Sequence, residues 1–75
     1  MTEHELRVEI AQAKLDAAMA RLKYAESDLR RENALAGATT AQELDEAMRR
    51  YEVAMAKVRQ ATAKLELTKK QHEGN

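Results

Sequence analysis

Large and small apolar residues alternate in two segments of the chain, at steps of three and four residues. In the first segment the pattern is made by Val8, Leu15, Leu22 and Leu29, with Ala11, Ala18 and Ala25 between them. In the second it is made by Leu44, Tyr51, Val58 and Leu65, with Ala47, Ala54 and Ala61 between them. Steps of three and four place residues on one face of an α-helix and are typical of coiled coils. The pattern therefore predicts two long helices.

The two segments are mirror images of each other about Ala38. Residues at equal distance from Ala38 pair a large side chain with a small one, so that Leu22 faces Ala54 and Leu15 faces Ala61. Two helices pack closely when a large side chain on one helix faces a small side chain on the other. This match also fixes the register of the two helices. The sequence predicts an all-α fold class, with two long helices in an antiparallel coiled-coil hairpin.

Helix boundaries are marked by short polar motifs. Thr2 followed by Glu5, and Thr40 followed by Glu43, match the capping box, in which a hydroxyl and a carboxylate satisfy the first free amides of a helix. Gly37 suits the left-handed backbone just past a helix end. We expect one domain over residues 1–75, with a first helix at about 3–36, a turn at 37–40 and a second helix at about 41–73.

Composition narrows the classes of function. The chain has 75 residues without Phe or Trp, and this size and thin apolar content make a deep catalytic pocket improbable. Thirteen basic residues balance thirteen acidic ones, so the overall charge lacks the footprint of a nucleic-acid binder. There is no apolar run of membrane-spanning length and no signal-peptide pattern. We expect no nucleic-acid partner and no membrane insertion by this segment.

The chain offers little catalytic chemistry. His4 and His72 are mirror-related about Ala38 and should face each other at the open end, beside several glutamates. Two imidazoles at fraying ends, without a fixed ligand spacing, make a poor metal site. No nucleophile lies at a defined spacing from a base, and there is no Gly-rich phosphate loop. We expect no enzymatic activity, no cofactor and no metal.

Most charged residues have an explanation on their own helix. Several acids precede a base by four residues, the favourable order on a helix surface. These pairs are Glu3 with Arg7, Glu26 with Arg30, Asp45 with Arg49, Glu46 with Arg50, and Glu66 with Lys70. They predict a solvated outer face.

A second row of apolar residues lies away from the seam, the line of contact that the apolar pattern predicts between the two helices. The members that we expect to serve lateral packing are Ile10, Ala17, Tyr24, Val53 and Leu67. Alanine is the best helix former, so alanines in such a row need no partner. The larger members are not explained by helix propensity and favour packing against neighbouring hairpins. Met48 and Met55 either fill the edge of the seam or form an adaptable contact surface.

The pattern changes near the bend. A polar run from Arg30 to Asn33 precedes it, and Glu32 takes a seam position opposite Leu44. Hairpin tips are usually solvated and polar, so these residues need no function to explain them. The alternative is that the tip recognises a partner.

With this turn, the chain resembles the α-helical hairpin of membrane fusion proteins, the periplasmic adaptors of tripartite efflux pumps and type I secretion systems. The resemblance covers the Ala-rich heptads, the segment from Arg31 to Thr40 and the return from Gln42 to Ala47. It implies a non-enzymatic coupling module whose tip contacts an outer-membrane channel protein. The tip residues that it implies are Arg31, Leu35, Gly37 and Thr40. In the family a serine follows the leucine by seven residues, whereas Thr40 follows Leu35 by five, so this turn is about two residues shorter.

The resemblance also implies lateral packing of several hairpins and a periplasmic location. The alternative is a free-standing cytoplasmic hairpin that homodimerises into a four-helix bundle, as a small regulatory module that binds protein or RNA. Self-association is expected in either case.

Overall fold

The first helix begins at a capping box. The computed structural model describes residues 1–35 and 37–73, and in it α1 spans Glu3–Ala34. The backbone N–H of Glu5 donates to Thr2 Oγ1 at 3.1 Å, and the N–H of Thr2 donates to Glu5 Oε1 at 3.4 Å. These bonds satisfy amides that have no partner within the helix, and they confirm the motif predicted from the sequence.

The second helix, α2, spans Ala41–Glu73 and begins in the same way. The N–H of Glu43 donates to Thr40 Oγ1 at 3.0 Å, and the N–H of Thr40 donates to Glu43 Oε2 at 3.3 Å. The second predicted capping box is therefore also present.

The first helix ends two residues earlier than the predicted boundary at residue 36. Leu35 is already its cap, and the carbonyl of Leu35 accepts the N–H groups of Ala38 at 2.7 Å and Thr39 at 3.0 Å. These bonds turn the chain away from the helical path. Gly37 has a φ of 95°, so the left-handed backbone that was expected at this residue is present. Gly37 lies two residues after the cap residue Leu35.

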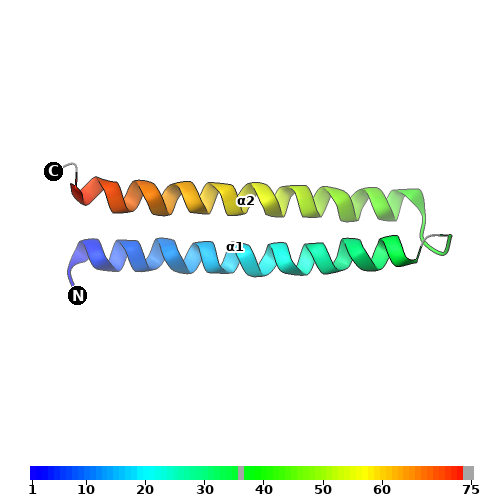
Figure 1. Cartoon of the computed structure of the whole chain (residues 1–75), viewed down its shortest axis with the longest axis horizontal. Helices are drawn as coiled ribbons and strands as arrows, with labels where there is room; N and C mark the ends of the chain where they lie inside the picture. Colours follow the sequence, from blue (N-terminus) through cyan, green and yellow to red (C-terminus); the bar gives the residue numbers. More distant parts are fainter. Residues whose placement is uncertain (36, 74–75) are drawn as a thin grey trace.

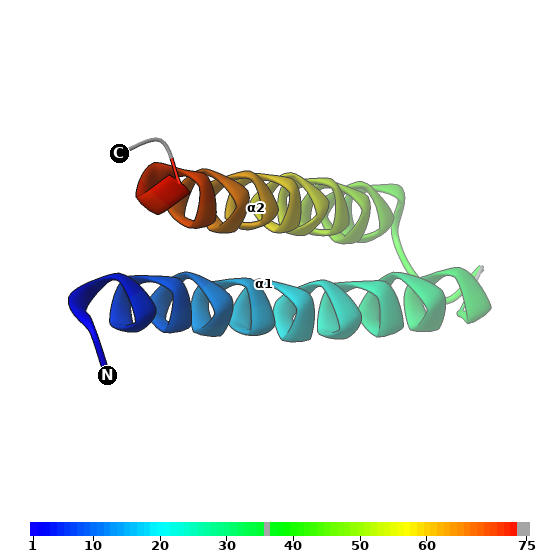
Figure 2. The same cartoon turned by 60° about the vertical axis from the view of Figure 1, so that its left-hand side comes forward.

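The two helices form an antiparallel hairpin. They run side by side along their whole length, with the turn at one end and the start of α1 beside the end of α2 at the other (Figures 1 and 2). The molecule measures 57 × 19 × 12 Å. The predicted fold class is confirmed.

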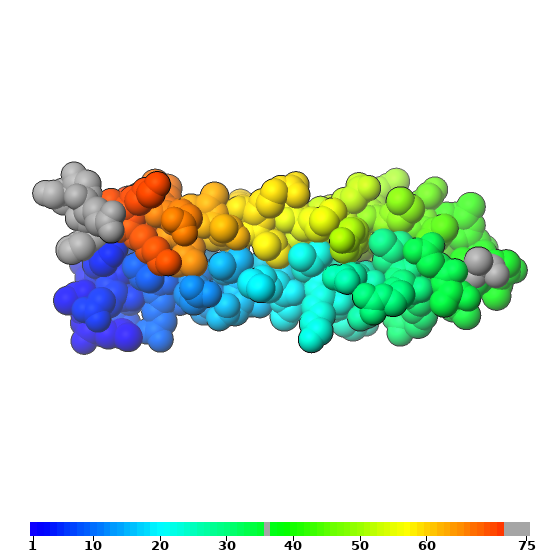
Figure 3. All heavy atoms as spheres, viewed as in Figure 1, coloured from blue at the N-terminus to red at the C-terminus, as the bar shows by residue number. Residues whose placement is uncertain are grey.

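The core is a single seam between the helices. Its buried apolar residues all occupy positions predicted from the apolar pattern: Ala11, Ala18, Ala25, Ala47, Ala54 and Leu65. Thr68, three residues after Leu65, is buried as well. Most of the large residues that alternate with the alanines, such as Leu22 and Tyr51, are only half-buried. Two helices enclose the side chains nearest the plane between their axes and leave longer ones partly in solvent. In the space-filling view the helices touch along the length of the rod (Figure 3).

Leu65 and Leu67 allow a direct test of the seam, because they lie two residues apart on α2 and are 5% and 52% exposed. Leu65→Ala should lower the free energy of unfolding by about 2 kcal/mol or more, because it leaves a void in the seam. Leu67→Ala should lower it by less than about 0.5 kcal/mol. Urea denaturation followed by circular dichroism measures both, and equal losses would contradict the seam.

Candidate functional site at the tip and on one broad face

The tip presents Leu35 at the end of α1. Its backbone N–H donates to the carbonyls of Arg31 at 3.1 Å and Glu32 at 3.2 Å, which fixes the residue at the helix end. Its side chain is 47% exposed. Gly37 is also exposed, and no atom lies within 4 Å of the place that a Cβ would occupy there. Glycine is therefore required by the positive φ and not by crowding.

Thr39 joins the two helices across the turn. Its hydroxyl lies 2.6 Å from Glu32 Oε2 and 2.8 Å from Glu43 Oε2. A hydroxyl carries one proton, so it donates to one of these carboxylates at a time. The contact with Thr39 gives Glu32 a polar partner. Glu32 is half-buried and lies at the end of the seam next to the turn. The hydroxyl of Thr39, and then the backbone N–H of Thr40, lower the pKa of Glu43 below its usual range.

Thr40, predicted to be a tip contact, has a structural role in this turn. Its hydroxyl accepts a hydrogen bond from the backbone N–H of Glu43 in the first turn of α2. Arg31, Leu35, Gly37 and Thr40 thus lie around one bend, but only Leu35 and Gly37 are exposed without a side-chain role in the fold.

Below the tip, one carboxylate binds two arginines from different helices. Arg31 Nη2 lies 2.7 Å from Asp28 Oδ1, and Arg50 Nη2 lies 2.9 Å from Asp28 Oδ2. The Asp28 side chain is 17% exposed. The hydrogen bond from Arg31, followed by the one from Arg50, lowers the pKa of Asp28, and the same contact with Asp28 raises the pKa of Arg31. This cluster fixes α1 against α2 just before the bend.

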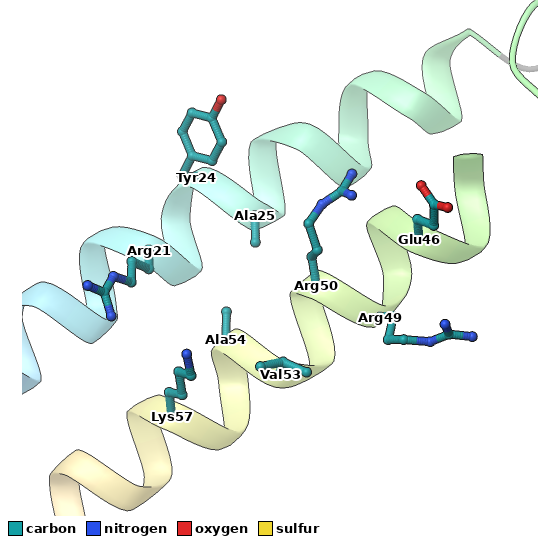
Figure 4. A pocket seen from close by; sticks show the side chains of 9 residues that line it. All are labelled: Arg21, Tyr24, Ala25, Glu46, Arg49, Arg50, Val53, Ala54 and Lys57. Carbon is teal, nitrogen blue, oxygen red and sulfur yellow. The ribbon is translucent and has the colours of Figure 1, made fainter. Parts of the chain in front are cut away.

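The prediction that Arg50 pairs with Glu46 is wrong, because Arg50 binds Asp28 on the other helix instead. The Arg50 side chain extends from α2 toward α1 (Figure 4). Asp28 and Arg50 are nearly mirror-related about Ala38 and occupy positions that flank the seam. That relation was visible in the sequence and would have identified the pair.

The other predicted pairs divide into two groups. Glu3 with Arg7, at 2.6 Å, and Glu26 with Arg30, at 3.0 Å, are confirmed. Neither the pair Asp45 and Arg49 nor the pair Glu66 and Lys70 is among the salt bridges of the described residues. Exposed pairs of this kind contribute little to stability, so their formation or loss does not decide the fold.

The predicted lateral residues lie on one broad face of the hairpin. Shallow hollows on that face are lined by Ile10, by Ala17, and by Tyr24 with Val53. Leu67 takes the same helical position as Val53 about four turns further along α2. Tyr24 is 74% exposed. In the close-up, Ala25 and Ala54 point toward one another across the seam, with Tyr24 and Val53 on either side of them (Figure 4).

Sequence reasoning missed the charge of this face. Arg21, Arg50 and Lys57 line the same hollow as Tyr24 and Val53. An overall charge balance hides such an arrangement, because it says nothing of which side of the rod each charge occupies.

Residues suited to metal binding do not come together in the part of the chain that the structure describes, where no group of three or more His, Cys, Asp or Glu is placed to hold an ion. The side chain of His72, the predicted neighbour of His4, lies outside the described residues. Within 1–35 and 37–73, neither helix is long and apolar enough to cross a membrane.

No family model, curated protein or solved structure matches this chain. The class of the protein, an all-α helical hairpin with coiled-coil-like packing, therefore rests on its own structure.

The Asp28 cluster predicts a dependence of stability on pH. Because its pKa is lowered from the ordinary value of 3.8, folded Asp28 holds a proton more weakly than unfolded Asp28. Its contribution is complete above the unfolded pKa and is lost as the pH falls through the folded pKa. Melting curves should show Asp28→Asn with a lower Tm than wild type at pH 7 and with a smaller difference near pH 2.

Asp16→Asn is the matched control. Asp16 accepts a hydrogen bond from Gln12 on its own helix, so its loss removes the same charge without an interhelical contact. Its Tm at pH 7 should stay close to that of wild type. An equal drop for both variants would mean that the bond between Asp28 and Arg50 does not stabilise the hairpin.

Proposed function

We propose that this hairpin is a non-enzymatic coupling module, like the hairpin of a periplasmic adaptor, which packs beside other hairpins and contacts an outer-membrane channel protein through its tip. The observation that carries the proposal is Leu35, a large apolar side chain left half-exposed at the end of a long rod. Burial of the exposed part of this side chain against a partner removes apolar surface from water and favours binding.

The tip is held rigid by three sets of bonds. The Leu35 carbonyl binds two amides of the turn, Thr39 bridges Glu32 and Glu43, and Asp28 ties α1 to α2. A binding residue on a preorganised support loses little entropy when its partner arrives. This rigidity supports a docking role for Leu35.

Arg31 adds a cation one turn before Leu35. Its guanidinium is bound to Asp28, and its side chain is still 62% exposed. An apolar anchor beside a cation suits the carboxyl end of partner helices, where carbonyl groups carry partial negative charge. Contact by one small tip is weak, so coupling depends on several hairpins that dock together.

A second candidate function is supported by the seam. Large seam residues such as Leu22 and Tyr51 are half-buried in the single hairpin, and Met48 and Met55 lie beside them. A second copy packed over that edge would form a four-helix bundle, the form expected of a small cytoplasmic regulator that binds protein or RNA. A tight dimer with both methionines buried, and no larger species, would favour this function.

The tip contact can be tested by photo-crosslinking in the cells that make the chain. A photoreactive residue at exposed Asn33 should form a product with an outer-membrane channel protein. Leu35→Asp should reduce that product about tenfold or more, because it places a charge in an apolar contact. It should leave helicity and Tm nearly unchanged.

Ala20→Asp places the same charge on the exposed middle of α1 and should leave the product unchanged. Crosslinks only to further copies of the hairpin, or to RNA, would overturn the channel contact. A large fall in Tm for Leu35→Asp would place Leu35 in the core.

A further inference from the structure

Four cations line one groove beside the seam. Lys14 and Arg21 come from α1 and Lys57 and Lys64 from α2, with Ala18 and Ala61 between them. Each of the four is exposed, and none takes part in a salt bridge of the described residues. Lys14 opposes Lys64, and Arg21 opposes Lys57, in the same register as Asp28 and Arg50. Like charges that face each other repel, so this four-cation groove favours an anionic partner.

The groove belongs to a face with excess positive charge, which we call the basic face. It consists of the helical positions that flank the seam on the side of Asp28 and Arg50, and the next positions outward. Its bases are Arg7, Lys14, Arg21, Arg31, Arg50, Lys57 and Lys64, and its acids are Glu3, Asp28, Glu43 and Glu46. Two of the acids bind Arg7, Arg31 and Arg50, and Glu43 binds Thr39. Glu46 lines a hollow with Arg21 and Lys57, but no salt bridge of the described residues joins it to either cation.

The corresponding positions on the other side of the seam form an acidic face. Its acids are Glu5, Glu9, Asp16, Glu26, Asp45, Glu52 and Glu66, and its bases are Lys23, Arg30, Arg59 and Lys69. Asp16 lies within the stretch of the rod that holds the four cations, Glu66 lies two residues beyond Lys64, and Glu9 and Glu52 lie five residues before Lys14 and Lys57. Arg59 is a base within the same stretch, so the two faces are opposite in net sign and their acids and bases overlap in part along the axis.

Both faces also carry exposed apolar side chains. The basic face has Ile10, Tyr24, Val53 and Leu67, and the acidic face has Met19 and Met48, with half-exposed Met55. Apolar groups among charged ones are the composition of a protein contact. The broad face spans 57 by 19 Å, so it has room for the roughly 800 Å² per partner of a standard interface.

We infer that the partner of the basic face is the acidic face of a second copy of this chain. Contact between two basic faces would oppose two four-cation grooves, so the contact is heterologous, with a different face used by each copy. Each copy then keeps one face free, and association continues beyond two chains into a ring or a filament. The inference deepens the lateral packing in the proposed function and does not depend on docking by the tip.

Charge reversal in matched pairs tests this contact. Wild-type chain should form species larger than a dimer in sedimentation velocity runs at low salt and should dissociate at about 1 M NaCl, because salt screens exposed charges. Arg21→Glu with Lys57→Glu, or Asp16→Lys with Glu52→Lys, should each weaken association about tenfold or more. An equimolar mixture of the two double variants should restore it, since a reversed basic face then meets a reversed acidic face.

The control is Lys23→Glu with Arg59→Glu, which makes the same charge change two residues further along each helix, on the acidic face. It should preserve or strengthen association. Circular dichroism of each variant at dilution checks that the helices form, and restoration by mixing shows that a lost contact, and not misfolding, caused the loss.

Several outcomes overturn the inference. One is a wild-type chain that stays monomeric at low salt, and another is a dimer as the largest species. A third is association that survives reversal of Arg21 and Lys57. If wild type binds vesicles rich in phosphatidylglycerol, or RNA, without self-association, the groove serves that polyanion instead. Crosslinking from Asn33 to a channel remains an independent measure of the tip, so failure of one contact is distinguishable from failure of the other.

Discussion

The structure depends on one packing constraint: small side chains must lie at regular intervals along the surface that the two helices share. Two helices have only one shared surface, and close approach along all of it requires small side chains at regular intervals. The buried alanines, among them Ala18, Ala25 and Ala54, supply those intervals. A thin seam follows, and so does the partial exposure of Leu22 and Tyr51.

Because the seam is thin, polar contacts at the positions beside it help to fix how the two helices align. Asp28 fixes the register through Arg50, and Thr39 closes the seam over Glu32. Lys14, Arg21, Lys57 and Lys64, further along the same side of the seam, take part in no salt bridge of the described residues. The same geometry that joins the helices near the tip therefore leaves a basic groove along the shaft, next to the apolar side chains of Tyr24 and Val53.

Local rules predicted the starts of both helices correctly, but only two of the five ion pairs. The capping boxes at Thr2 and Thr40 involve residues three apart, and no distant contact competes with them. The first helix was predicted too long because Gly37 was taken to lie directly after its last residue. Arg50 was assigned to Glu46 by a rule for one helix, whereas Asp28 on the other helix offered a less exposed partner that was also bound by Arg31.

The sequence by itself determined the fold, since a heptad pattern that is mirrored about Ala38 has one way to bury its apolar face. It also indicated that Leu35 and the outer apolar residues lie outside the seam. Only the tertiary structure decided which side of the rod each outer residue occupies. Helix periodicity tells which face of its own helix Lys14 or Lys64 occupies. The pairing of the two helices makes these residues neighbours. Charge segregation is a property of that pairing, so a net charge of zero could coexist with two oppositely charged faces.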